Sequence, residues 1–144
     1  MIQDEHSQNL LKGESTLYQG TRFPEGTLRR KADLQRRIRP DPGDGRKRIR
    51  LHVKGDSMLP VLQTGDWVSI DLDSELDDAE VGQLATYIAT VGPGQESYYT
   101  HQIIQIDRNQ STGSPELVMR GINNPRNDVQ RVTTENFIGI SGKL

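Results

Sequence analysis

The chain has 144 residues and a mass of 16.2 kDa, a length that suits one domain of ordinary size. Hydrophobic residues form 32% and charged residues 26% of the sequence, at a formal net charge of -2, a balance that rules out a wholly disordered chain. The sequence has no cysteine, which rules out a disulfide framework, a thiol nucleophile and a cysteine-based zinc site.

The sequence carries no sign of a membrane span or of an export signal. No apolar run approaches the roughly 18 residues that a transmembrane helix requires. The N-terminal segment MIQDEHSQNLLKGES lacks the basic-then-apolar order of a secretory signal. We therefore expect a cytoplasmic protein, or one that associates peripherally with a membrane.

Charge is strongly segregated along the chain. Residues 22–50 carry eleven Lys or Arg against four Asp or Glu, whereas residues 51–144 carry six against thirteen. Such a basic stretch can contact nucleic acid or anionic lipid, or it can dock on the acidic surface of its own domain. Its basic residues are not interleaved with aromatic ones, which favours a solvated or self-docked segment over a platform for single strands.

Within the basic stretch, Leu28–Ile38 (LRRKADLQRRI) has a thin apolar stripe at i,i+4 spacing. This pattern predicts a short surface helix or a partly ordered arm. The following PDPGDGRK, residues 40–47, is rich in proline and glycine and predicts a hinge. We therefore divide the chain into a basic N-terminal segment, 1–48, part of which need not be ordered, and a β domain, 49–144.

From Ile49 onward, apolar and polar residues alternate with a period of two, which is typical of half-buried strands. The turn-forming GPGQES joins two of the longer runs into an expected hairpin. The acidic stretch Asp71–Glu80 is the best place there for a helix or long turn. The expected strands are Ile49–Val53, Val68–Leu72, Gly82–Val91, Tyr98–Ile106, Glu116–Arg120 and Phe137–Ile140. The body of the protein is therefore predicted to be mostly β.

The densest local signal is the turn Lys54-Gly55-Asp56-Ser57-Met58-Leu59-Pro60, which follows the first of these strands. Glycine permits a sharp exit from the strand, and proline keeps the residue before it out of the helical region. Ser57 is thus expected on a tightly specified turn that can aim its hydroxyl and nearby N–H groups into one cleft. Taken alone, the pattern is more often ordinary turn chemistry.

The run GDSMLPVLQTGDWVSID, which contains Ser57, closely resembles the serine-methionine box of the signal peptidase I and LexA-like repressor superfamily. In that box the nucleophilic serine precedes methionine, and the next strand opens with Gly-Asp. Residues 81–87 (VGQLATY) are similar to the family's following strand, and FIGI at 137–140 is similar to its closing strand. The resemblance implies a coiled, partly open β-barrel of mainly antiparallel strands.

The same resemblance implies which residues carry the chemistry. Residues 100–104 (THQII) are similar to the strand that bears the general base, which is a lysine in bacterial-type signal peptidases and in the repressors. His101 stands at this position, as in the archaeal and endoplasmic-reticulum branch. Residues 119–128 (MRGINNPRND) resemble that branch's Lys-Gly-Asp-Asn-Asn box, which implies Asp128 as the catalytic acid.

The chain departs from the family pattern at three points. Gln102 stands where the family usually has arginine after the base, and Ile122 replaces the first aspartate of the Gly-Asp-Asn-Asn box. No membrane anchor precedes the serine box, although signal peptidases normally work at the bilayer.

A serine hydroxyl is a weak nucleophile at neutral pH, and a neutral imidazole can accept its proton. In the implied triad, His101 takes the proton of Ser57, and Asp128 orients the imidazole and stabilises its charged form. The resemblance also implies that an extended peptide binds as an added strand beside the Ser57 turn. Gly55 and Met58 are the residues expected to line this substrate-binding cleft.

Other residues give weaker evidence for a site than Ser57, His101 and Asp128 do. His6 and His52 have no ligand spacing with each other or with His101, so we expect no metal. The acidic side chains between positions 71 and 80 lack the glycine and the final glutamate of a calcium loop, which favours a solvated acidic face. Trp67 and Tyr87 are most simply core or rim aromatics. We expect no cofactor.

The leading prediction is a serine endopeptidase that cleaves an extended peptide or protein substrate through an acyl-enzyme, without a membrane anchor of its own. One alternative is a self-cleaving regulator of the LexA-like kind. Another is a non-catalytic binding module whose residues 22–50 contact an anionic partner, either nucleic acid or a lipid surface. A homodimer is compatible with each of these functions.

Overall fold

The computed structural model of the chain describes residues 16–144. The expected features of residues 1–15, including His6, lie outside this range. The elements are β1 (Thr16–Tyr18), β2 (Phe23–Pro24), α2 (Lys31–Arg37), β3 (Arg48–His52), β4 (Trp67–Asp71), the 3-10 helix η1 (Leu76–Asp78), β5 (Leu84–Gly92), β6 (Gln95–Arg108), β7 (Pro115–Arg120) and β8 (Phe137–Lys143).

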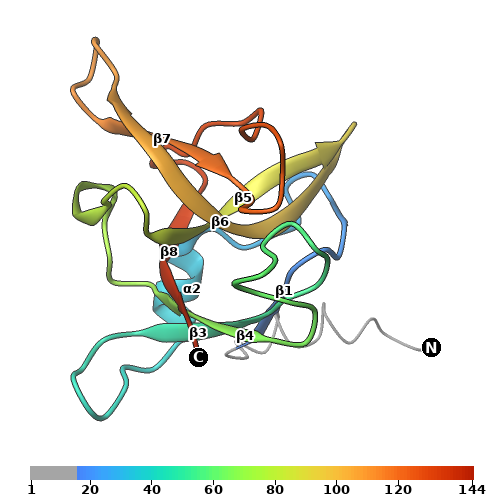
Figure 1. Cartoon of the computed structure of the whole chain (residues 1–144). Helices are drawn as coiled ribbons and strands as arrows, with labels where there is room; N and C mark the ends of the chain where they lie inside the picture. The colour runs from blue at the N-terminus through green and yellow to red at the C-terminus, as the bar shows by residue number, and fades with distance from the viewer. Residues whose placement is uncertain (1–15) are drawn as a thin grey trace.

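The strands form one strongly curved sheet in the order β1-β3-β4-β8-β5-β6-β2, with β7 paired to β6 (Figure 1). The neighbouring strands run antiparallel, except that β1 pairs with β3 in parallel. The sheet does not close into a complete barrel. The prediction of a mostly β, partly open and mainly antiparallel architecture is confirmed.

The alternation of apolar and polar residues determines which face of each strand is buried. In β3, Ile49 and Leu51 are fully buried while Arg50 between them is exposed, and β7 repeats the pattern over its six residues. The expected hairpin is formed by β5 and β6, which turn at Pro93 and Gly94. Gly94 has a φ of +67° there, which a residue with a side chain rarely adopts.

The predicted helix is shorter than its sequence pattern. α2 begins at Lys31, and Ile38 has already left the helical region with φ −94° and ψ 135°. Leu34 is its buried residue, and Leu28 is buried just ahead of it without being helical. The basic side chains of Arg36 and Arg37 occupy the last turn, where a cation is favoured by the helix dipole.

Residues 16–48 belong to the same packed body as the rest of the chain. Leu17, Phe23, Leu28, Leu34 and Ile38 lie in one buried cluster with side chains of β3 and β4. A second cluster lies between the 3-10 helix and strands β5 to β8, around Tyr87, Ile103, Met119 and Phe137. The packing is therefore continuous across residue 48, where the sequence predicts a boundary.

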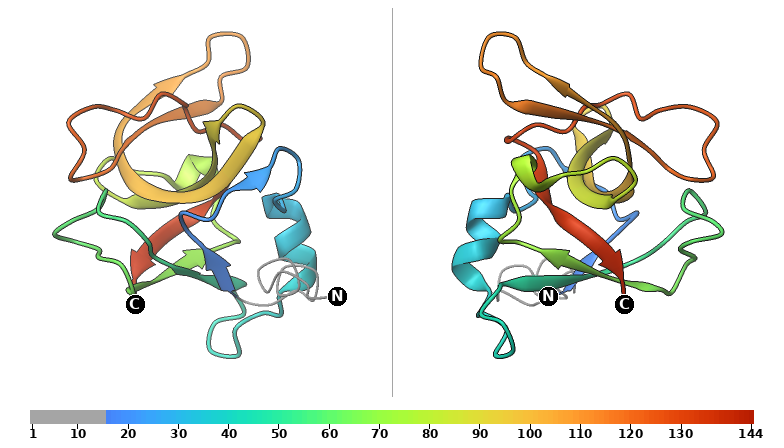
Figure 2. Two further views of the ribbon diagram at one scale, coloured as in Figure 1. Left: turned by 90° about the vertical axis from the view of Figure 1, so that its right-hand side faces the viewer. Right: turned by 60° about the vertical axis from the view of Figure 1, so that its left-hand side comes forward.

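The segment between β1 and β2 crosses the opening of the sheet. These two strands are consecutive in the chain, yet they occupy opposite ends of the strand order (Figure 2). At the crossing, the N–H of Gln19 donates to the carbonyl of His52 at 3.0 Å, and Gln19 forms a single parallel bridge with Tyr98 of β6. Neither short strand was expected from the sequence.

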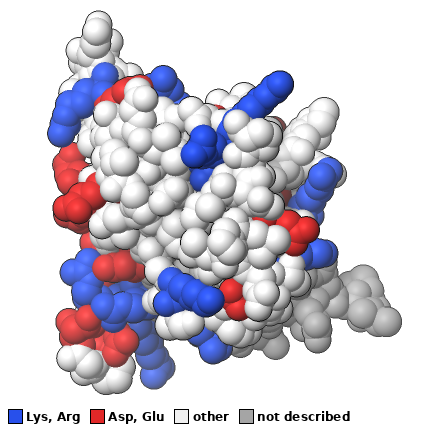
Figure 3. Space-filling view, viewed as in Figure 1, with Lys and Arg blue, Asp and Glu red and all other residues white. Residues whose placement is uncertain are grey.

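Much of the basic stretch is paired with acidic groups of the protein itself. Arg30 contacts Glu96 at 3.0 Å, Arg46 contacts Asp71 at 2.7 Å, and Lys31 reaches Glu75 at 3.3 Å. Figure 3 shows the resulting mixture of Lys, Arg, Asp and Glu along the left and lower-left edge of one face. These contacts agree with a self-docked segment, the reading that the charge pattern favours.

Candidate active site

Ser57 lies on the turn that leaves β3. Gly55 has a φ of +100°, so the sharp exit from the strand requires glycine. The N–H of Gly55 donates to the hydroxyl of Thr64 at 2.9 Å, and the N–H of Leu62 donates to the carbonyl of Met58 at 2.9 Å. Met58 is only 1% exposed, so its side chain anchors the turn in the core.

The loop that follows β7 holds the same turn from the other side. The N–H of Asn123 donates to the carbonyl of Ser57 at 2.8 Å, and its side-chain amide donates to the carbonyl of Asp56 at 3.0 Å. The approach is close because Gly121 has no side chain. A Cβ at Gly121 would lie 2.7 Å from the carbonyl oxygen of Ser57. This contact explains why part of the expected Gly-Asp-Asn-Asn-like box is glycine.

His101 reaches Ser57 from the curved β6 strand. Its backbone pairs with Ala85 of β5, and its residue is 3% exposed. The Nε2 atom of His101 lies 3.1 Å from the Oγ of Ser57, a distance at which the hydroxyl can donate to the ring. The ring of Tyr99, two residues earlier, lies 5.1 Å away between centroids and limits how far the imidazole can turn.

Asp128 completes a chain of polar contacts on the far side of the imidazole. Its Oδ2 lies 2.5 Å from the Nδ1 of His101, and its N–H donates to the carbonyl of Met119 at 2.7 Å. A carboxylate can only accept here, so the proton of the neutral ring resides on Nδ1. The Nε2 lone pair is then directed to Ser57 and can accept its proton.

The hydroxyl of Tyr87 donates to the same Oδ2 of Asp128 at 2.6 Å. Tyr87 lies on β5 and is 1% exposed. Burial, reinforced by the Asp128 carboxylate, raises the pKa of Tyr87 well above its ordinary value. The phenol therefore stays protonated and remains a donor, which fixes the orientation of the carboxylate.

The reactive groups open on a cleft of about 230 Å³. Ser57 is half-buried at its edge. Among the described residues, no acceptor contacts the backbone N–H groups of Asp56, Ser57 or Met58, so donors are available beside the hydroxyl. The cleft is lined by Gln19, Gly20, Lys54, Gly55, Asp56, Ser57, Tyr99, His101 and Asn124.

The structure brings Ser57, His101 and Asp128 together, although 44 and 27 residues separate successive members along the chain. Gly55 lines the cleft as expected. Met58 does not, because its side chain points into the core beneath the turn. Two of the three departures from the family pattern are substituted residues: Gln102 donates to the carbonyl of Gly82 at 3.2 Å, and the N–H of Ile122 contacts the sulfur of Met58 at 3.4 Å.

Five residues at the site were not expected from the sequence: Gln19, Gly20, Tyr87, Tyr99 and Asn124. Two of them had a usable signal. Tyr99 lies two positions before His101 on one strand, and residues two apart share a face. Tyr87 lies opposite Tyr99 in the hairpin register, so a correct register places both near the histidine. Gln19 had no such signal, because its position depends on a distant strand.

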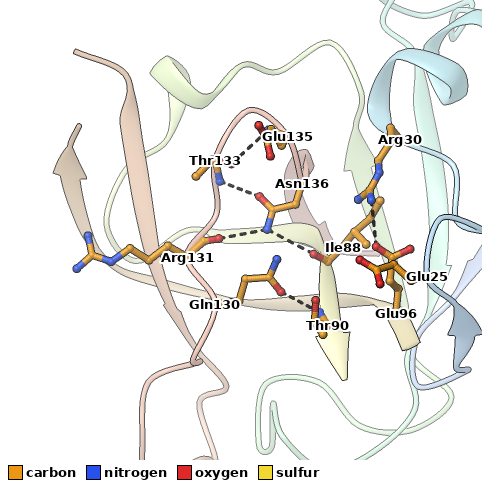
Figure 4. A pocket seen from close by; sticks show the side chains of 10 residues that line it. All are labelled: Glu25, Arg30, Ile88, Thr90, Glu96, Gln130, Arg131, Thr133, Glu135 and Asn136. Carbon is orange, nitrogen blue, oxygen red and sulfur yellow. Dashed lines mark hydrogen bonds and ion pairs between the residues drawn. The ribbon is translucent and has the colours of Figure 1, made fainter. Parts of the chain in front are cut away.

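Three other cavities among the described residues are larger and lack this chemistry. The first, of about 510 Å³, is polar, and several of its groups are paired with one another (Figure 4). Arg30 meets Glu96 in it, while the Asn136 amide donates to the carbonyls of Ile88 and Arg131. The second, of about 480 Å³, lies on the other side of Tyr99 and Asp128, and the third, of about 290 Å³, lies beside Asn109 and Glu116. None of the three contains a serine in contact with a histidine, so we assign the candidate site to the smaller cleft.

No metal site is apparent in residues 16–144, because no three His, Asp or Glu side chains are grouped to hold an ion. His52 instead lies between the rings of Tyr18 and Trp67, with a 4.5 Å centroid distance to Trp67. Over the same range, no helix has the length and hydrophobicity to cross a bilayer.

No protein-family model, curated protein or solved structure matches the chain. The functional assignment therefore depends on the chemistry of the cleft and on the short sequence motifs that form it.

Proposed function

We propose that the protein is a serine endopeptidase in which Ser57 is the nucleophile, His101 the general base and Asp128 the residue that orients the base. One observation carries the proposal: an unbroken chain of contacts, 3.1 Å from the Ser57 Oγ to Nε2 and 2.5 Å from Nδ1 to Asp128. This is the arrangement that converts a weakly nucleophilic hydroxyl into an attacking group.

In the acylation step, the Oγ of Ser57 attacks the carbonyl carbon of a peptide bond while its proton passes to the Nε2 of His101. The resulting oxyanion receives hydrogen bonds from the free N–H groups of the Ser57 turn. The imidazolium then returns the proton to the leaving amine, the C–N bond breaks, and an ester on Ser57 remains.

Deacylation repeats the cycle with water. His101 removes a proton from water, the resulting hydroxide attacks the ester carbonyl, and the proton returns to the Oγ as the ester bond breaks. Asp128 keeps its negative charge throughout and stabilises the transient imidazolium. Tyr87 contributes by holding the carboxylate in place.

The resemblance to the signal peptidase and LexA-like superfamily supports the same roles, because its three boxes supply the three residues that are in contact here. It also supports an extended peptide as the substrate, bound as an added strand next to the Ser57 turn. With the histidine base, the proposed enzyme is closest to the archaeal and endoplasmic-reticulum type of signal peptidase.

The first test is Ser57→Ala, assayed by labelling with a small fluorophosphonate and by cleavage of a defined mixture of decapeptides. We expect loss of labelling and a fall of about 10⁴-fold or more in kcat/KM, with an unchanged circular dichroism spectrum. Ser111→Ala is the matched control, since Ser111 lies on an exposed loop. A Ser57→Ala protein that still cleaves the peptides at the wild-type rate would rule out the proposed nucleophile.

A further inference from the structure

The wall of the Ser57 cleft includes a buried side-chain oxygen that has no hydrogen-bond partner among the described residues. Gln19 is 4% exposed, and this oxygen is its Oε1. The backbone N–H of the same residue is satisfied, because it donates to the carbonyl of His52 at 3.0 Å. The unpaired atom is therefore in the side chain.

An unpaired buried polar atom destabilises a fold, and nearly all such atoms in native proteins have a partner. Gln35 of α2 follows this rule, since its Nε2 donates to the carbonyl of Leu72 at 2.6 Å. Gln19 breaks the rule at the cleft that holds Ser57 and His101. A polar atom in such a place is explained by a partner that enters the cleft.

The position of Gln19 is fixed by the segment that crosses the sheet opening. Its bridge to Tyr98 places it beside Tyr99, whose ring packs against His101. On the other side, a Cβ at the neighbouring Gly20 would lie 3.3 Å from the Lys54 side chain, so this segment is packed against the strand that leads to Ser57. The backbone of Gln19 is thus fixed by packed neighbours at the wall of the cleft.

The chemistry of a primary amide selects the class of partner. A glutamine side chain offers one acceptor and two donor hydrogens. A peptide backbone presents an N–H and a C=O along its length and can engage either group, whereas a phosphate or carboxylate offers only acceptors. An extended peptide is therefore the ligand class that satisfies this side chain in either orientation of its amide.

We propose that Gln19 is a substrate-binding residue whose amide hydrogen-bonds to the backbone of a peptide lying in the Ser57 cleft, away from the scissile bond. This inference rests on the proposed endopeptidase function and adds a specificity element from outside the serine, histidine and aspartate boxes. It predicts that substrates must extend beyond the residue that is acylated.

The test compares wild type with Gln19→Met, in which an apolar side chain of similar length replaces the amide. Three probes are used: a small fluorophosphonate, an acetylated one-residue boronate and a tetrapeptide boronate ending in the same residue. We expect labelling and short-boronate affinity within about twofold of wild type, and affinity for the long boronate about tenfold weaker. Thermal stability should be unchanged or higher, because the variant removes an unsatisfied polar atom.

Gln35→Met is the matched control, because it removes an amide that does have a partner. It should lower the melting temperature and leave the affinities for both boronates unchanged. Gln19→Asn, which withdraws the amide by one methylene, provides a second variant should Gln19→Met fail to fold. It should also bind the long boronate more weakly while the short one is unaffected.

The possible failures are distinguishable. If wild type reacts with no probe, the endopeptidase function is wrong and this inference falls with it. If wild type binds both boronates and Gln19→Met binds the long one equally well, only the role of Gln19 is refuted. Equal losses for all three probes, or a lower melting temperature in both Gln19 variants, would assign Gln19 a structural role instead and overturn the inference.

Discussion

At the scale of single residues, the site is a chain of four polar side chains, from Ser57 through His101 and Asp128 to Tyr87. Each contact in this chain has a defined direction. The carboxylate of Asp128 can only accept, and the protonated phenol of Tyr87 donates to it. The Asp128 oxygen that contacts the imidazole is the same one that accepts from Tyr87. Orientation of the proposed base therefore depends on Tyr87, which does not line the Ser57 cleft.

The first prediction concerns this positioning role of Tyr87. Tyr87→Phe removes one hydroxyl and should reduce kcat by about tenfold with little change in KM, because Asp128 loses a fixed partner while the cleft is untouched. The free energy of unfolding should fall by about 1 kcal/mol, the usual contribution of one hydrogen bond. Steady-state kinetics and urea titration measure the two effects.

Tyr98→Phe is the appropriate control for that measurement. Tyr98 is equally buried, and its hydroxyl donates at 3.0 Å to the carbonyl of Arg29, away from the triad. It should show the same loss of stability with kcat unchanged. Equal kcat values for Tyr87→Phe and wild type would refute the positioning role.

At the scale of elements, two loops meet at Ser57, the proposed nucleophile: the turn after β3 and the loop after β7. Their backbones come together at Gly121, where a side chain would contact both the carbonyl of Ser57 and the amide of Asn124. The second loop also leads to Asp128, so one segment both supports the Ser57 turn and carries the proposed acid.

Gly121→Ala is predicted to damage the site through this contact. An added Cβ would lie 2.7 Å from the Ser57 carbonyl oxygen and 2.6 Å from the Asn124 amide nitrogen, so the turn must shift. We expect kcat/KM to fall by about tenfold to a hundredfold and stability to fall by about 1–3 kcal/mol, the usual cost of overpacking. Peptide kinetics and thermal unfolding report both.

Gly142→Ala tests whether replacing any glycine by alanine is enough to lower kcat/KM and stability. A Cβ at Gly142, on β8, would meet no atom within 4 Å, and its backbone does not adopt a positive φ. This variant should retain wild-type activity. A Gly121→Ala protein that is as active as Gly142→Ala would show that the turn tolerates displacement.

The longer strands could be predicted from the sequence, and the short ones could not. The alternation of residues in β3 and the turn residues between β5 and β6 are local sequence patterns, and the structure follows both. β1 and β2 have three and two residues, too few for a period to register. They are strands because β3 and β6 supply their hydrogen-bond partners, which is tertiary information.

The candidate site divides in a similar way. Ser57, His101 and Asp128 could be proposed because each lies in a motif with a distinctive local sequence. Gln19 could not, because its position depends on a distant strand. Tyr87 has no motif of its own, and only the hairpin register opposite Tyr99 indicates that it lies near the histidine. Met58 is implied as a cleft residue by the family resemblance, whereas packing of the turn directs it inward.

At the scale of the whole molecule, residues 16–48 are part of the same packed domain as the rest of the described chain. Their ion pairs join them to the acidic surface, their apolar residues complete one of the two buried clusters, and Gln19 with Gly20 completes the cleft. Basic groups already paired with the protein's own carboxylates are less available to an anionic partner. This organisation favours an intramolecular role for residues 22–50.

A fragment of residues 49–144 is therefore predicted not to fold on its own. It lacks Leu17, Phe23, Leu28, Leu34 and Ile38, which the larger cluster buries, and each such side chain contributes about 1.5–3 kcal/mol of burial. Their combined loss, about 7.5–15 kcal/mol, is as large as the usual stability of a domain. The amide spectrum of the fragment should show collapsed dispersion, measured against the full chain under the same conditions.

A fragment that gives a dispersed spectrum and a cooperative thermal transition would contradict this prediction. It would also restore residues 49–144 as an independent domain and free the basic segment for another partner. Salt-dependent DNA binding by the full chain, absent from the fragment, would then favour the alternative of a nucleic-acid-binding module.

The place of β8 has a consequence for how the protein is made. This strand follows all the others in the chain, yet it pairs with both β4 and β5 in the middle of the sheet. During translation, β4 and β5 cannot form their hydrogen bonds with β8 until residues 137–143 have been synthesised. Pairings between strands that are distant in sequence also form slowly. We therefore expect the sheet that carries the proposed triad to be completed only after β8 has been synthesised.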